Sequence, residues 1–287
     1  MNYLMLIAIL FWSGAFIAAK YSIPEFPPFT LTFLRFSIAL FIIFFLMIRF
    51  EKHWKIKWKD VPQFLFLGLV GMFGYHILFF MALKHTTVIN SSLIGAAFNP
   101  LTTTLLAVWF LKDKITLKKG LAFLICFIGV IITITEGNFL LLFQSGINIG
   151  DLLMFFAVIC WAVYTVYSKK VSLHFPPLVI TTYSFLFCTI LLIPFVLMEK
   201  PWTFIYKTSI RGWLAVLYMA IFPSVIGFLV QQISVRKIGP RRTAMFIFLI
   251  PVFSIFLSVL LLKEVLHPIK IFSSLVIIAG VYFSTQS

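Results

Sequence analysis

Long apolar runs, separated by short basic or proline-containing connections, make up almost the whole chain. A helix needs about 20 consecutive apolar residues to cross the hydrocarbon core of a membrane, and the runs here reach that length. Charged residues, prolines and glycines divide the sequence into ten such segments. The pattern predicts an all-α integral membrane protein with ten transmembrane helices, at residues 3–21, 30–49, 62–83, 90–111, 118–136, 150–168, 178–198, 211–234, 242–262 and 269–286.

Composition adds to this picture. Of the 287 residues, 62% are hydrophobic and 11% are charged, a balance that a soluble domain cannot bury in its core. The formal net charge of +15 comes from Lys and Arg in short clusters between apolar runs, so it indicates membrane topology and not nucleic-acid binding. Cys126, Cys160 and Cys188 lie within apolar runs and lack metal-ligand spacing. We expect buried apolar cysteines, no metal and no cofactor.

Basic residues in the connections favour one orientation of the ten segments. If the N-terminus is cytoplasmic, the inside connections hold fifteen Lys and Arg and the outside connections seven. The first segment has no basic start and no small-residue cleavage site, so we expect it to be a retained membrane helix. The prediction is a multi-pass protein of the inner (plasma) membrane with both termini in the cytoplasm.

A proline phrase occurs twice in the sequence. "FPPF" begins at Phe26 and "FPPL" begins at Phe175, 149 positions later. Adjacent prolines cannot lie inside a helix, so both phrases mark a break between helices. The offset of 149, which becomes 151 further along, pairs Trp12 with Trp161, Lys20 with Lys169, Pro100 with Pro251, Lys112 with Lys263 and Gly129 with Gly280.

These offsets predict two copies of a five-helix unit, at residues 1–137 and 148–287. Because five is an odd number, the second copy must enter the membrane from the side opposite to the first. Inverted repeats are a recurrent architecture of transporters, with the substrate near the middle of the bilayer between the two copies. The repeat therefore indicates transport.

Several stretches resemble the EamA family of the drug/metabolite transporter superfamily, and the likeness covers essentially the whole chain. They are "FWSGAFIAAK", "TFLRF", "GDLLMFFAVICWAVYTVYSKK", "RKIGPRRTAMFIFLIPVFSIFLSVLLLKEVL" and "IIAGV". The resemblance implies a ten-helix carrier with cytoplasmic termini, a central cavity between two five-helix halves, and export or uptake of small metabolites such as amino acids. Relatives often carry Glu before the mid-helix proline, whereas here Asn99 precedes Pro100 and Ile250 precedes Pro251. Any role of that carboxylate is therefore not carried over.

Polar residues inside membrane segments are candidates for the transport pathway, because a polar group facing lipid is costly. In the fourth segment, Ala96, Asn99 and Thr103 form a small and polar stripe around Pro100. Proline cannot bond the carbonyl four residues back, so the Ala96 oxygen and the Asn99 side chain are predicted to face a cavity. Pro251 repeats this predicted helix break. A packing kink with small residues is the alternative interpretation.

The third segment contains His76, which titrates near neutral pH, and the matching face of the eighth segment carries Ser224 and Gln231. Two tryptophans lie near the middle of their segments, away from the interfaces where Trp is usual. Such rings can line an amphipathic site or contact a cation. The predicted substrate-binding residues are Trp12, Tyr75, His76, Asn99, Trp161, Tyr164, Ser224 and Gln231.

Arg35 lies about two turns into the second segment, where its long stem can extend outward, so we expect a structural or lipid-anchoring role. All eight acidic residues lie in connections or at segment ends. A proton-driven antiporter of cations usually needs an embedded carboxylate, so neutral or zwitterionic substrates are favoured. Proton coupling through His76 and facilitated exchange both remain open. A phosphate site would want several embedded cations, which are missing here.

The resulting hypothesis is a transporter, with export favoured, of small metabolites led by amino acids, and not an enzyme. It would work by alternating access around a cavity at the middle of the membrane. Its partners would be the small-molecule substrate and the lipid bilayer; a monomer would suffice, and the oligomeric state is open. The alternatives are a multidrug, amine or sugar-type carrier, a lipid-modifying membrane enzyme, and a receptor or scaffold that transports nothing.

The ten-segment count makes a prediction about the two ends of the chain. Reporter proteins fused to the N-terminus and to the C-terminus should both be active in the cytoplasm, because an even number of crossings returns the chain to its starting side. A C-terminal reporter that is active only outside would rule out ten crossings.

Overall fold

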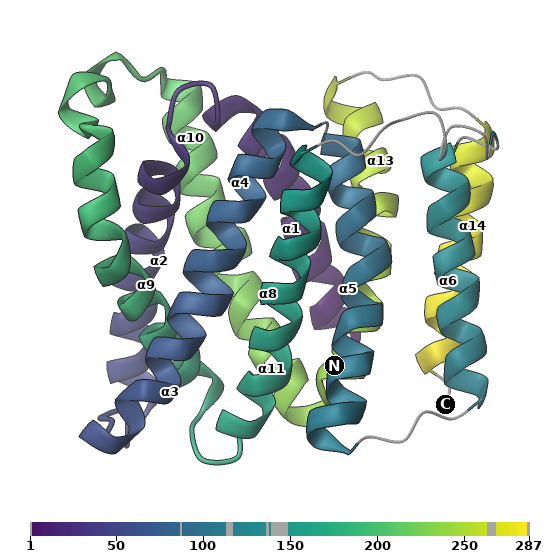
Figure 1. Cartoon of the computed structure of the whole chain (residues 1–287), viewed down its shortest axis with the longest axis horizontal. Coiled ribbons are helices and arrows are strands. Elements are labelled where there is room, and N and C mark those ends of the chain that lie inside the picture. The colour runs from purple at the N-terminus through teal and green to yellow at the C-terminus, as the bar shows by residue number, and fades with distance from the viewer. Residues whose placement is uncertain are drawn as a thin grey trace.

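The computed structural model describes residues 2–86, 88–112, 117–135, 138, 149–262 and 268–285, and this part of the chain contains helices and no strand (Figure 1). The first half contains α1 (Asn2–Ser22), α2 (Pro28–Phe50), η1 (Trp58–Asp60), α3 (Val61–Phe66), η2 (Leu67–Gly74), α4 (Tyr75–His85), α5 (Val88–Leu111) and α6 (Leu117–Thr135). The second half contains α8 (Ile149–Val171), α9 (Pro177–Glu199), η3 (Pro201–Thr203), η4 (Ile205–Lys207), α10 (Ile210–Met219), η5 (Ala220–Gly227), α11 (Phe228–Ile238), α12 (Pro240–Met245), η6 (Phe246–Leu249), α13 (Ile250–Leu262) and α14 (Pro268–Thr285).

The all-α membrane fold predicted from the apolar runs is confirmed. Eight stretches of the described residues are long and apolar enough to cross a membrane. The helices α6 and α14 contain shorter apolar stretches, Gly120–Ile132 and Ile271–Phe283. The number of crossings therefore stays a prediction, and the predicted junction at 137–148 lies, except for residue 138, outside the described residues.

The repeated proline phrase starts two helices that pack side by side, α2 and α9. In each, the second proline stands at the first helical position, where its missing N–H costs no hydrogen bond. The carboxylate of Glu199, at the end of α9, accepts hydrogen bonds from the backbone N–H of Phe29 and Thr30, at 3.2 and 2.7 Å. One helix therefore caps the start of its neighbour with a charge that suits a helix N-terminus.

The third helix of each half changes to a π-helix midway, at η2 and η5. η5 contains Pro223, which has no N–H to donate. The hydroxyl of the next residue, Ser224, donates to the Met219 carbonyl five residues back, at 2.8 Å. Short π-helical stretches often accompany functional sites because they shift the side chains that follow them.

Figure 1 shows α6 and α14 side by side at one edge of the bundle, while α1, α4, α5 and α8 lie in its middle. Gly129 and Gly280 allow the close approach of the edge pair. A Cβ atom on Gly129 would lie 2.7 Å from a side-chain carbon of Ile277, and one on Gly280 would lie 3.0 Å from the backbone nitrogen of Cys126. Small residues at such contacts are typical of helices that pack within a membrane.

Replacing Gly280 with leucine should separate α14 from α6, because the new side chain meets the backbone of Cys126. We expect a loss of about 1–3 kcal/mol in stability, measured as a lower melting temperature in detergent. Gly120→Leu is the matched control, since it adds the same side chain to α6 where a Cβ atom meets nothing within 4 Å. Equal melting of the two variants would contradict this packing.

Candidate functional site

A cavity of about 60 Å³ lies in the middle of the bundle, lined by residues of α1, α2, α4, α5, α8, α11 and the α12–α13 region. Five of the eight predicted binding residues line it, and the apolar remainder of the wall includes Phe79, Met154 and Phe228. Sites for small molecules are usually apolar with a few placed polar groups, as here. The five predicted residues are Trp12, Tyr75, His76, Asn99 and Trp161.

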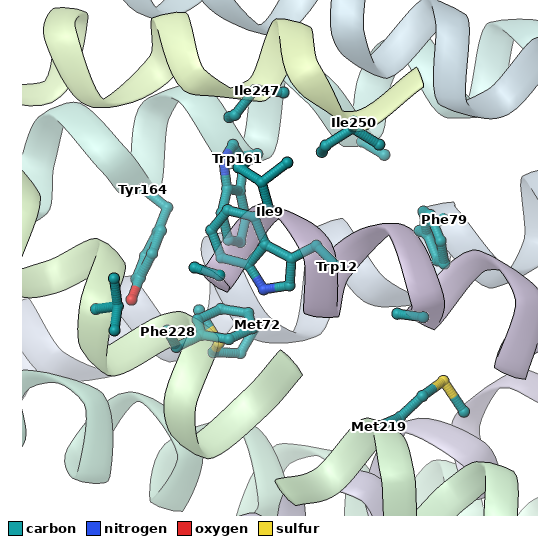
Figure 2. Packing of buried hydrophobic residues seen from close by; sticks show 14 of the residues in the cluster. Ile9, Trp12, Met72, Phe79, Trp161, Tyr164, Met219, Phe228, Ile247 and Ile250 are labelled. Atoms are coloured by element: carbon teal, nitrogen blue, oxygen red, sulfur yellow. The ribbon is translucent and has the colours of Figure 1, made fainter. Parts of the chain in front are cut away.

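Two tryptophans from opposite halves of the chain meet at this cavity (Figure 2). The rings of Trp12 and Trp161 pack edge to face, with centroids 5.8 Å apart, and Phe228 contacts both. The indole N–H of Trp12 donates to the carbonyl of Pro223 at 3.1 Å. A Cβ atom on Gly227 would lie 2.6 Å from that indole nitrogen, so only glycine leaves room for the ring. The packing holds both indoles in fixed positions.

His76 belongs to an aromatic wall on α4. Its Nδ1 lies 2.9 Å from the Met72 carbonyl, which can only accept, so Nδ1 carries a hydrogen and the neutral ring keeps Nε2 as an acceptor. The ring packs edge to face on Phe36, with centroids 4.7 Å apart. Tyr75 lies next to it, and its ring is 4.8 Å from that of Trp161. His76 is 2% exposed, so packing fixes its orientation.

Arg35 does not extend outward as the sequence predicted. Its side chain is 4% exposed and lines the cavity, and its Nε donates to the hydroxyl of Ser224 at 2.8 Å. That hydroxyl is oriented to accept, because its own hydrogen goes to the Met219 carbonyl. The outward prediction was wrong because it considered the length of the arginine stem and not the partner that η5 offers.

No carboxylate lies in the cavity lining among the described residues. Several acids that the structure describes form hydrogen bonds near helix ends elsewhere. Glu25 accepts from the backbone N–H and hydroxyl of Ser209, and Asp151 accepts from the hydroxyl of Thr86. Arg35 therefore brings a positive charge to the lining that no described acid there balances, and a guanidinium pairs best with a carboxylate or a phosphate.

Asn99 reaches the cavity from α5 together with Ala96, as the polar stripe predicted. It is 5% exposed, and its Oδ1 accepts from the hydroxyl of Thr103 at 3.2 Å. The α-helix continues through Pro100, so the predicted break is not an interruption of α5. Pro251 lies in the first turn of α13, where a 3₁₀ stretch becomes α-helical.

Three predicted residues, Tyr164, Ser224 and Gln231, do not line the cavity. Ser224 instead accepts the hydrogen bond from Nε of Arg35. Tyr164 packs on Trp161, with ring centroids 5.6 Å apart, and its hydroxyl accepts from the amide of Gln232. The amide of Gln231 donates to the hydroxyl of Thr165 at 3.3 Å. These last two hydrogen bonds form a buried polar layer between α8 and α11, on the side of Trp161 toward the end of α8.

The chain can be assigned to a family. The sequence profile of the EamA-like transporter family matches it twice, over residues 1–135 and 148–286. The chain belongs to the EamA-like transporter family. This confirms the resemblance seen in the sequence motifs and makes the protein a multi-pass membrane transporter.

Relatives within the EamA-like family cover nearly the full chain. An "Uncharacterized transporter YyaM" of Bacillus subtilis (strain 168) is 34% identical, over 97% of this chain and 92% of its own. An "Uncharacterized transporter" of Archaeoglobus fulgidus is 31% identical, over 98% and 96%. A "Probable amino-acid metabolite efflux pump" of Salmonella typhimurium is 23% identical, over 99% and 94%. A solved structure with 22% identity shares the fold, with a TM-score of 0.79 over 99% of this chain and 96% of the other.

Filling the cavity should block the transporter without unfolding it. Gly95 lines the cavity, and a Cβ atom there meets nothing within 4 Å. Gly95→Leu should therefore remove substrate-dependent flux in liposomes while leaving the melting temperature near that of the parent. Gly120→Leu, which adds the same side chain away from the cavity, should keep normal flux. Normal flux in both variants would mean that this cavity is not the transport site.

Proposed function

We propose that this protein carries small metabolites bearing a carboxylate, with zwitterionic amino acids the leading class, through the central cavity. The observation that carries the proposal is the buried guanidinium of Arg35, which lines the cavity without a carboxylate from the described residues. Burying an unbalanced charge is costly, and an incoming carboxylate would balance it.

The geometry around Arg35 suits this role. Ser224 accepts from Nε, so one edge of the guanidinium is fixed while its terminal nitrogens remain for a ligand. A planar guanidinium can bind a carboxylate through two parallel hydrogen bonds. Trp12, Trp161 and Tyr75 would pack against an apolar side chain or the face of an ammonium group.

The family comparison supports the same class of substrate. One relative is named a probable amino-acid metabolite efflux pump, and export is the direction we propose here as well. His76 is the proposed coupling group if transport uses protons, since its imidazole can take up and release a proton. We place the protein in the plasma membrane with both termini in the cytoplasm and assign it no catalytic activity.

Alternating access would come from two inverted five-helix halves, which we propose at residues 1–137 and 148–287 with ten membrane crossings in all. The double match to the family profile supports two such units. Residues paired by the sequence offsets also line the cavity together. These pairs are Trp12 with Trp161, Ala96 with Ile247, and Asn99 with Ile250.

The cavity is lined from the middle of α1, the start of α4 and the first two-thirds of α5 and α8. Beyond Trp161, toward the end of α8, the layer formed by Tyr164, Thr165, Gln231 and Gln232 is buried. In the proposed topology this conformation is closed to the cytoplasm. Export would require the two halves to rock and open that layer.

Replacing Arg35 should weaken binding of the carboxylate specifically. For Arg35→Gln we expect a fall in apparent affinity of about tenfold or more in counterflow assays with amino acids, because a hydrogen bond to a charged group is lost. The parent should discriminate against amino-acid methyl esters, and the variant should handle acids and esters alike.

Arg49→Gln is the matched control for this experiment, since it removes an exposed arginine from the last turn of the same helix. It should transport normally. If Arg35→Gln kept the full preference for acids over esters, Arg35 would not be the carboxylate site.

A further inference from the structure

A second and larger hollow lies on the surface of the bundle, between α1 and α10, with a volume of about 670 Å³. Its wall is mostly apolar and partly exposed; Leu214, for example, is 56% exposed. At the base of the hollow, Gly14 leaves room for the ring of Tyr218. A Cβ atom on Gly14 would collide with the hydroxyl of Tyr218, which donates to the carbonyl of Phe11 at 3.2 Å. We call this hollow the α1–α10 groove.

The groove runs along the helices from the middle of the bundle to one of its ends. Leu10 on α1 and Phe222 in η5 line its inner part. Tyr21, near the end of α1, and Arg211, near the start of α10, line its outer part. The α1–α10 groove is elongated and apolar, as an acyl chain is. An arginine and a tyrosine lie at its outer end, and such residues favour the membrane interface, where lipid headgroups lie.

The charge at the outer end of the groove is positive. Lys20 precedes Tyr21 in the last turn of α1, and Lys207 lies before the start of α10. The nearby carboxylate of Glu25 is taken up by the backbone and hydroxyl of Ser209, both at 2.6 Å. Among the described residues, no ion pair joins Arg211 to an acid. An anionic group arriving at this end would therefore find a cation.

A smaller hollow of about 310 Å³ lies between α5 and α8, at the place that the sequence offset relates to the α1–α10 groove. Four of its residues lie 149 positions after four residues of the α1–α10 groove. It is smaller partly because valine and tyrosine replace glycine and alanine. The matching positions are Gly14 and Val163, Ile17 and Val166, Ala18 and Tyr167, and Tyr21 and Lys170. Two places that the repeat relates to each other are thus both hollow. Each lining contains a basic residue, Arg211 in the α1–α10 groove and Lys170 in the smaller hollow.

We propose that the α1–α10 groove binds one anionic glycerophospholipid, with an acyl chain along the groove and the phosphate at Arg211. Apolar contact alone gives little preference in a membrane, because lipid tails surround every helix. Selection must come from the headgroup, and an arginine can bind phosphate through two hydrogen bonds. This site is separate from the central cavity and does not depend on the proposed substrate.

Native mass spectrometry of the detergent-purified full chain tests the proposal. The protein is titrated with phosphatidylglycerol or phosphatidylcholine that carry the same palmitoyl and oleoyl chains. We expect one phosphatidylglycerol to be retained with a preference of about fivefold, the effect of one basic residue at a membrane surface. Arg211→Gln should abolish the preference, and Leu214→Trp should fill the groove and reduce retention of both lipids.

The control is Lys200→Gln, which removes a cation from the α9–α10 connection at the same end of the bundle but outside the groove lining. It should keep the parent's preference. Equal retention of the two lipids by the parent, or an unchanged preference in Arg211→Gln, would overturn the proposal. An equal loss in Lys200→Gln would also overturn it, because the preference would then reflect general surface charge. None of these readouts involves transport, so a failure here leaves the proposed function untouched.

Discussion

A cation in the interior of a membrane protein must be held by polar partners, and the centre of this structure depends on how Arg35 meets that requirement. In η5, the hydroxyl of Ser224 donates to the Met219 carbonyl and is left to accept from Arg35, and Pro223 lies next to it. The carbonyl of that proline accepts from Trp12. One irregular π-helical stretch therefore positions both the charge and an aromatic wall of the cavity.

The cavity is built from matching positions in the two halves, yet its chemistry is not symmetric. Trp12 and Trp161 are identical across the halves, whereas Asn99 in the first half corresponds to Ile250 in the second. Arg35 corresponds to Ser184, which bonds its own helix. Polar and charged groups of the lining thus come mostly from the first half. An asymmetric wall can orient a molecule that has one charged end and one apolar end.

The sequence was sufficient to predict an all-helical membrane protein, because run length and clustered charge are local properties on which insertion into lipid depends. It also singled out Trp12, His76 and Asn99, which line the cavity, since each is an unusual residue for the middle of a membrane segment; their role in binding stays a prediction. Arg35 was misplaced because its direction depends on Ser224, which lies 189 positions away. Phe228 was missed because, with 36 phenylalanines in the chain, nothing in the sequence separates a lining ring from a packed one.

The buried layer behind Trp161 bears on how the proposed carrier would change conformation. Gln231 and Gln232 each use the amide nitrogen, but the side-chain oxygen of each has no hydrogen-bond partner among the described residues. A buried polar atom without a partner typically costs about 1–3 kcal/mol, so the closed layer is less stable than one with all its hydrogen bonds made. A carrier needs two arrangements of similar free energy, because a substrate can shift their balance only by its difference in affinity. In the closed conformation two side-chain oxygens lack a hydrogen-bond partner, and opening the layer to water would give both of them one. This keeps the free-energy difference between the closed and the open conformation small.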